Sequence, residues 1–149
     1  MNLKLSILWM FVGSVIIGIY LNAMNIMADD YSHLYFSSTT LIYSAIFMAS
    51  LMSILEILMF YVHSGELSIE CLITFVSLSV IMTYFLREQM FVNDKQWLKR
   101  MISHHSTAIT TSKKIKDKTE NDDVKKLAVS IIDQQNDEIE IMKKLINEQ

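Results

Sequence analysis

The sequence predicts an all-helical membrane protein in which three transmembrane helices precede an amphipathic helical hairpin. Hydrophobic residues make up 52% of the 149 residues, and the absence of Pro favours long uninterrupted helices over a loop-rich fold. No Lys or Arg occurs between Leu5 and Leu86, whereas charge recurs on nearly every turn from Arg87 onward. We therefore expect a membrane domain over residues 1–86 and a C-terminal hairpin domain over residues 87–149.

Three apolar stretches are each close to the ~20 residues that a helix needs to cross the hydrocarbon layer. They cover residues 5–27, 41–62 and 68–86. The first stretch follows Lys4 and has an alternative interpretation as a cleaved signal peptide, but its apolar run is long for that role. The connection over residues 63–67 is very short, so the second and third spans should form an antiparallel pair.

After Arg87 the pattern changes to two amphipathic helices separated by a polar break over residues 117–123. Asn121 or Asp122 can cap the second helix, which should run from about Asp123 to Ile146. Each helix has an apolar stripe that it cannot bury alone, so the two should pair. A two-helix core is thin, which favours further packing against a second copy or against the spans.

Polar and sulfur-bearing side chains stand on both stripes, and they are the candidate ligands of a metal site. These are Met101, His104 and His105 on the first helix, and Gln135, Glu138 and Met142 on the second. Imidazole with thioether suits copper, whereas imidazole with carboxylate suits iron, zinc or oxidised copper. The alternative is a hydrogen-bonded pair of His104 and Glu138 that sets the register of the hairpin without a metal. Adjacent side chains point about 100° apart on a helix, so only one histidine can point into the core.

The run from Asp94 to Ile109, DKQWLKRMISHHSTAI, resembles the signature of a bacterial domain family of unknown function. The hallmark of that family is Met-Ile-Pro-His-His followed by Ala-Ile. The run from Ile131 to Met142, IIDQQNDEIEIM, is similar to the family's second helix. Members have a ferritin-like helical fold, and some, such as the CopM-like proteins, bind copper and support copper resistance. A membrane-bound branch has three hydrophobic helices ahead of this domain, and residues 35–61 are similar to its Met-rich second span.

This resemblance implies a ferritin-like half-bundle and a set of ligand positions. The implied metal ligands are Met101, His104, His105, Glu138 and Met142, with Asp94, Trp97 and Gln135 as supporting positions. The sequence departs from the family pattern at two places. Ser103 replaces the motif proline, which we expect to loosen the start of the helix, and Lys99 replaces a residue that is often acidic, which removes one possible carboxylate ligand.

A second group of candidates lies on one face of the second span, at spacings of three and four. It consists of Met48, Met52, Glu56, Met59 and His63. An ionisable residue in a span is a functional hypothesis by default, and stacked thioethers can pass on a soft cation such as Cu(I). The alternative is that Met is a common filler of apolar helices and that Glu56 pairs with a hydroxyl on a neighbouring helix.

The function we expect is a membrane-anchored metal-binding protein that sequesters or relays copper through the hairpin. The alternative is a non-catalytic module for membrane interaction or oligomerisation whose His–Glu pair is structural. The cofactor is copper or another transition metal on the first hypothesis, and there is none on the second. No activated nucleophile or cofactor motif is visible, and neither hairpin helix carries the Glu-x-x-His motif of a ferritin-like redox site, so we do not expect an enzyme.

The expected partners are the lipid bilayer and a second copy of the chain through the hairpin. The net charge of −3 offers no basic footprint for nucleic acid. We expect the inner membrane of a bacterium. Arg87 and nearby lysines beside the third span favour a cytoplasmic C-terminus. Lys4 and the export of soluble relatives argue for the extracytoplasmic side, which we adopt.

Overall fold

A computed structural model describes residues 3–148, and over this range it is all-helical, as the sequence predicts. The chain divides into two compact units. The three-helix unit comprises residues up to Leu21 together with Thr39–Phe91. The hairpin unit comprises Asn22–Ser38 and the chain from Val92 onward. The division is not contiguous, because the segment between the first two apolar helices joins the hairpin unit.

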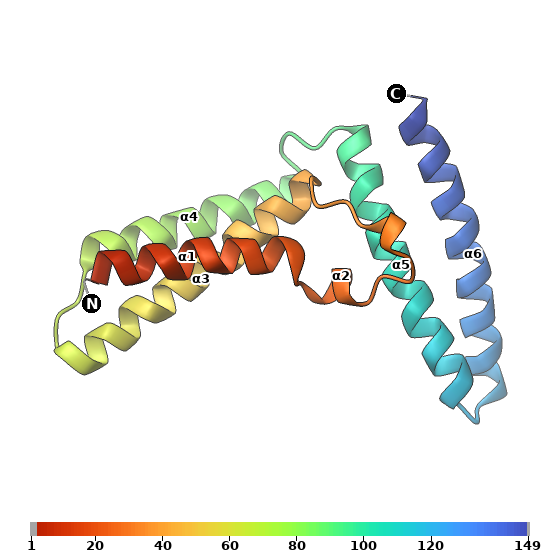
Figure 1. The fold of residues 1–149 in the computed structure, drawn as a ribbon, viewed down its shortest axis with the longest axis horizontal. Coiled ribbons are helices and arrows are strands. Elements are labelled where there is room, and N and C mark those ends of the chain that lie inside the picture. Colours follow the sequence, from red (N-terminus) through yellow and green to blue (C-terminus); the bar gives the residue numbers. More distant parts are fainter. Residues whose placement is uncertain (1–2, 149) are drawn as a thin grey trace. The chain divides into compact units, whose positions relative to one another are not determined.

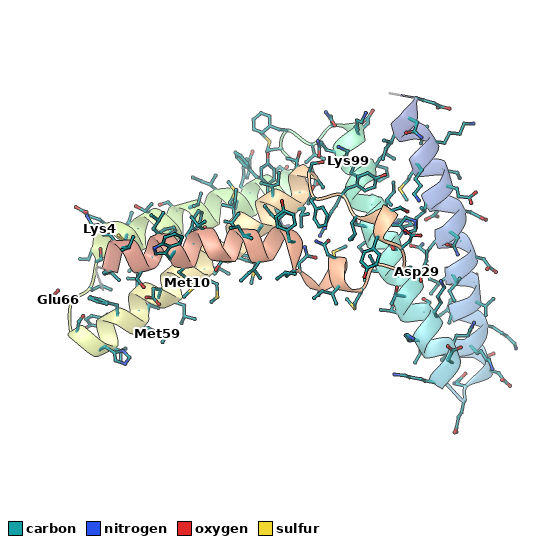
Figure 2. All side chains as sticks on the ribbon, in the orientation of Figure 1. Lys4, Met10, Asp29, Met59, Glu66 and Lys99 are labelled. Carbon is teal, nitrogen blue, oxygen red and sulfur yellow. The ribbon has the colours of Figure 1, made fainter. Side chains whose placement is uncertain are left out.

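The three-helix unit contains α1 (Leu3–Tyr20), α3 (Thr39–Ser64) and α4 (Ile69–Glu88), which lie side by side in Figure 1. By length and composition the chain has three helices that can cross a membrane, the first counted together with the short α2 (Ala23–Ile26). Figure 2 shows Lys4 and Glu66 at the same end of this unit. Gly65 in the short α3–α4 connection has a φ of +74°, a conformation that glycine adopts at little cost.

The sequence predicted one continuous apolar helix over residues 5–27. In the structure this stretch is broken into two helices. Helix α1 ends at Tyr20, and Asn22 then caps α2 by accepting a hydrogen bond from the Asn25 N–H through its side chain. Asn is among the preferred N-cap residues because its side-chain oxygen satisfies a backbone donor that the helix leaves unpaired. The apolar run therefore continues through a break.

Helix α3 packs against both α1 and α4 through a face of small residues. Ala45, Ala49, Ser50 and Ser53 are all buried there, and both serine hydroxyls donate to carbonyls of the preceding turn. A Cβ atom placed on Gly18 of α1 would lie 3.0 Å from the Cβ of Ala45. Apolar helices in a membrane associate by such close backbone approach, because lipid offers no hydrophobic drive between them.

The hairpin unit contains α5 (Asp94–Lys118) and α6 (Asp122–Asn147), which confirms the predicted helical hairpin. The side chain of Asn93 caps α5, and that of Asn121 caps α6 by accepting from two backbone N–H groups. The buried core between the helices consists of Leu98, Ile102, Ile109, Ile139 and Met142.

The connecting segment, Asn22–Ser38, lies against α5 and is held there by hydrogen bonds to small hydroxyl side chains of α5. The Asp29 N–H donates to Ser106 Oγ at 2.8 Å, and Ser103 Oγ donates to the His33 carbonyl at 2.8 Å. Lys113 Nζ lies 2.7 Å from an Asp29 oxygen, and Figure 2 shows Asp29 beside α5. These bonds satisfy backbone groups that would otherwise need water, which is why the segment belongs to the hairpin unit.

Replacing Gly18 by Leu should lower the free energy of unfolding of the three-helix unit by about 1–3 kcal/mol, because the added side chain overpacks the approach to Ala45. Thermal unfolding of the full chain in detergent measures this. The matched control is Gly13→Leu on the same helix, where an added Cβ meets nothing within 4 Å. Equal losses in the two variants would contradict the close-packing argument.

Candidate metal centre

The two adjacent histidines have different environments. His105 is 9% exposed and points toward α6, whereas His104 is exposed. Their ring centroids lie 6.0 Å apart in an edge-on arrangement. The 100° step between neighbouring helical side chains permits only one of them to enter the core. The structure therefore pairs His105 with Glu138, and the predicted His104–Glu138 pair is wrong within one chain.

Both ring nitrogens of His105 are engaged. Its Nδ1 lies 2.9 Å from the Met101 carbonyl oxygen, and its Nε2 lies 2.6 Å from Glu138 Oε2. A carbonyl oxygen only accepts, so Nδ1 carries a proton and Nε2 is the nitrogen whose state can vary. Two lone pairs do not attract at 2.6 Å. A hydrogen bond therefore joins Nε2 and Glu138 Oε2, with a proton between them.

Glu138 is held as a carboxylate by its neighbours. Gln134 Nε2 donates to Oε1 at 2.9 Å, and Gln135 Nε2 lies 3.4 Å from Oε2. The hydrogen bond from Gln134, followed by that from His105, lowers the pKa of Glu138. These two hydrogen bonds to the carboxylate stabilise the folded hairpin at pH values above the ordinary Glu pKa. This stabilisation is lost as the pH falls through the lowered pKa of Glu138. The side chain of Glu138 is 39% exposed, so solvent screens the pair.

An open groove of ≈ 340 Å³ surrounds this pair, between the N-terminal half of α5 and the C-terminal half of α6. It is lined by Trp97, Leu98, Met101, His105, Glu138, Ile141, Met142 and Leu145. No group of three His, Cys, Asp or Glu side chains suited to a metal occurs within residues 3–148. A metal in the groove therefore requires the thioethers of Met101 and Met142 as ligands beside His105 and Glu138.

The supporting positions are placed differently from one another. Trp97 lies at the rim of the groove, Gln135 is half-buried beside Glu138, and Asp94 is an exposed residue of the first turn of α5. The expected loosening at Ser103 is wrong, because α5 begins at Asp94 and Ser103 lies buried inside an unbroken helix. Lys99 donates to Ser37 Oγ at 3.2 Å, so it helps to hold the connecting segment.

The candidates on the second span do not converge on a shared site. Met48, Met52 and Met59 are 37–52% exposed on the surface of the three-helix unit. His63 is exposed and its Nδ1 bonds to the Met59 carbonyl, while Glu56 accepts a hydrogen bond from Ser6 on α1. The Ser6–Glu56 bond is the pairing with a neighbouring hydroxyl that the structural interpretation of Glu56 expected.

A second buried histidine, His33, was not singled out by the sequence analysis. It is 8% exposed, and its Nδ1 lies 3.0 Å from Ser106 Oγ, the oxygen that also accepts from the Asp29 N–H. Burial lowers the pKa of His33, and nearby Lys143 lowers it further, against the opposing effect of Asp29 and Asp30. The sequence does contain one signal for this contact. Ser103, Ser106 and Thr107 are spaced to form a polar face on α5, and such a face is suited to hydrogen bonds with another segment of the chain.

Residues 84–146 match the family described as "Domain of unknown function (DUF305)". The chain is also 34% identical over 142 residues to "Uncharacterized protein L153" of Acanthamoeba polyphaga mimivirus. That alignment covers 95% of this chain and 91% of the viral protein, so it includes the apolar helices as well as the hairpin. No solved structure matches the chain.

Acidification should loosen the connecting segment, because His33 binds a proton more readily once it is exposed. Its pKa in the folded chain lies below the ordinary 6.5. The stability it contributes is therefore present above pH 6.5 and is lost as the pH falls toward the lowered value. Hydrogen exchange of residues 22–38 in the full chain, corrected for intrinsic rates, measures this. In His33→Gln the dependence between pH 5 and pH 7 should flatten, and an unchanged profile would assign it to another group.

Proposed function

Because this chain belongs to the DUF305 family of domains of unknown function, we propose that its hairpin is a copper-binding module that sequesters or relays copper. Three apolar helices anchor the module to a bilayer. The observation that carries the proposal is the fixed tautomer of His105. With Nδ1 donating to the Met101 carbonyl, Nε2 is directed at Glu138 within the groove that Met101 and Met142 also line.

A histidine that binds a metal usually donates its other ring N–H to a carbonyl or carboxylate, which fixes the tautomer and the ring orientation. His105 has this second bond already. In the metal-free state a proton on Nε2 completes the pair with Glu138. A metal ion replaces that proton, so binding and deprotonation are coupled.

The donor set favours copper over harder cations. One imidazole and two thioethers suit Cu(I), whereas carboxylate-rich sites suit magnesium, calcium or manganese. Two ligands each about 2 Å from a tetrahedral ion lie roughly 3.3 Å apart, so the 2.6 Å His105–Glu138 contact has to open when an ion enters. The partial exposure of Glu138 permits this movement. We assign His105, Met101 and Met142 as the ligands of Cu(I), with Glu138 as an additional ligand for the oxidised ion.

The openness of the groove supports exchange of the ion rather than permanent burial. Trp97 and Leu145 at its edge are both more than 40% exposed in the single chain, so a copper donor or acceptor can approach the ligands of an unpaired hairpin directly. A structural metal is usually enclosed with its coordination completed by the protein. The arrangement therefore fits a protein that takes up and passes on copper.

Copper affinity of the full chain in detergent should fall at least about tenfold on replacing His105 by Gln, or Met101 and Met142 together by Leu. Leu keeps the size of Met and removes the thioether, so the helix packing is retained. Titration with Cu(I) against a competing chelator, and separately with Cu(II) and Zn(II), measures the effect.

Met48→Leu/Met59→Leu is the matched control, because it removes two exposed thioethers from the three-helix unit and should leave the affinity unchanged. If only this control variant lost copper binding, the copper site would lie on the second span instead. Equal affinities of the wild-type chain and the His105→Gln variant would refute the proposal.

The proposed location is the inner membrane of a bacterium, with the hairpin on the extracytoplasmic side. Lys4 before α1 and the odd number of apolar helices support this orientation. A C-terminal alkaline phosphatase fusion should then be active and a C-terminal fluorescent-protein fusion dark. The opposite pair of results would place the hairpin in the cytoplasm and contradict this part of the proposal.

A further inference from the structure

The hairpin exposes a second apolar face in addition to the one that joins α5 to α6. Seven large hydrophobic side chains of α5 and α6 are exposed, and the helical step of about 100° per residue places six of them on one side of the hairpin: Trp97, Ile115, Val124, Leu127, Ile141 and Leu145. Only Val129 lies elsewhere. A hairpin that packed alone would have no reason to gather its exposed apolar residues on one side.

These residues belong to two regular seams with alternating spacings of three and four. The seam on α5 is Trp97, Met101, His104, Ala108, Thr111 and Ile115. The seam on α6 is Val124, Leu127, Ile131, Gln134, Glu138, Ile141 and Leu145. A repeat of 3.5 residues keeps one face of a helix against a neighbouring helix over many turns. Each helix already uses a different face for its partner within the chain, so the open seams are suited to a second pair of helices, as in a four-helix bundle.

The two seams complement each other when they run antiparallel. Taken level by level, the pairs are Trp97 with Leu145, Met101 with Ile141, His104 with Glu138, Ala108 with Gln134, Thr111 with Ile131, and Ile115 with Leu127. Apolar residues meet at both ends, and the exposed imidazole meets the carboxylate near the middle. The His105–Glu138 bond shows that this part of α5 and this part of α6 already lie at the same level within one chain.

We propose that two copies of this chain pack open seam to open seam about a two-fold axis that runs parallel to the helices. Such an axis leaves the level of every residue unchanged and places α5 of one copy antiparallel to α6 of the other. A two-fold interface needs one surface that is complementary to itself, and the pair of seams satisfies this requirement. In the bundle His104 of one copy donates to Glu138 of the other.

The dimer has a consequence for the metal centre, and this part rests on the proposed function. Each Glu138 then faces His105 of its own chain and His104 of the second copy. A single chain brings one imidazole to an open groove, whereas the dimer brings two and covers the groove, because the groove residues Trp97, Met101 and Leu145 then lie in the interface. His104→Gln should therefore weaken copper binding by the dimer less than His105→Gln does, because His105 has its tautomer fixed by Met101 and His104 has no such bond among those described.

Disulfide trapping in the full chain, in detergent with a metal chelator, tests the dimer independently of copper. In a Cys71→Ser background, one tagged copy carries Ile115→Cys and a co-expressed copy with another tag carries Leu127→Cys. A copper-free oxidant should join unlike copies, and each variant alone should give little product. A disulfide-linked dimer from Ile115→Cys alone would indicate that α5 of one copy contacts α5 of the other. No disulfide-linked dimer in any combination would indicate that the proposed interface does not form. Either result overturns the inference. Asp117→Cys, on the far face of α5, replaces Ile115→Cys as the control and should not join.

Self-association of the full chain provides a second measurement. Leu127→Glu should weaken it at least about tenfold, which corresponds to about 1.4 kcal/mol, because the charge falls within the apolar part of the seam. Val129→Glu places the same charge two residues away at the exposed position outside the seam, and it should have little effect. Adding Ile115→Lys to Leu127→Glu should restore the dimer, since the two positions meet across the interface. Equal effects of the two Glu variants would overturn the inference even if copper binding were intact.

Discussion

The contact between His105 and Glu138 sets most of what the hairpin can do. It joins the middle of α5 to the C-terminal half of α6 at 2.6 Å and so fixes which residues of the two helices share a level. Because Nδ1 is committed to the Met101 carbonyl, the contact also leaves one nitrogen available for a cation. Register and chemistry therefore depend on the same imidazole. Such a pair is costly to bury unless both members are satisfied, and here Gln134 satisfies the second carboxylate oxygen.

The connecting segment gives the hairpin a third side that two helices alone would lack. Its carbonyl and amide groups bond to Ser103, Ser106 and Thr107 of α5, and Tyr35 packs on the hairpin core. A proline at position 103 has no side-chain hydroxyl and no N–H, so it would lose the bond from Ser103 to the His33 carbonyl. The departure from the family signature is therefore linked to the docking of this segment. With one face of α5 covered by the segment and another by α6, the remaining face is the one that carries the open seam.

The three-helix unit is held together by different means. The buried face of α3 combines Ala and Ser residues with Leu41 and Ile57, and the hydroxyls of Ser50 and Ser53 bond to their own helix. Many other large apolar side chains of α1, α3 and α4 are exposed, where a bilayer can solvate them. The hairpin unit instead has a core of large apolar side chains between its two helices, formed by Leu98, Ile102, Ile109, Ile139 and Met142. One chain thus combines packing suited to lipid with packing suited to water.

The sequence by itself determined the helical class, the three apolar helices and the hairpin, because hydrophobic run length and the periods of three and four are local properties of the chain. The asparagine cap of α6 was also predictable, since capping joins residues two or three positions apart. The sequence also narrowed the candidate ligands to side chains that stand on otherwise apolar stripes. It implied that the two histidines are unequal, because their side chains diverge by about 100°.

Only the tertiary structure decided which histidine enters the core, because His104 and His105 both lie on or beside the apolar stripe of α5. It also decided that Ser103 is an interior position, that α1 stops at Tyr20, and that the connecting segment belongs to the hairpin unit. The choice of histidine and the docking of the connecting segment depend on hydrogen bonds between groups far apart in the sequence. Such pairings between residues far apart in the sequence leave no periodic trace within either segment alone.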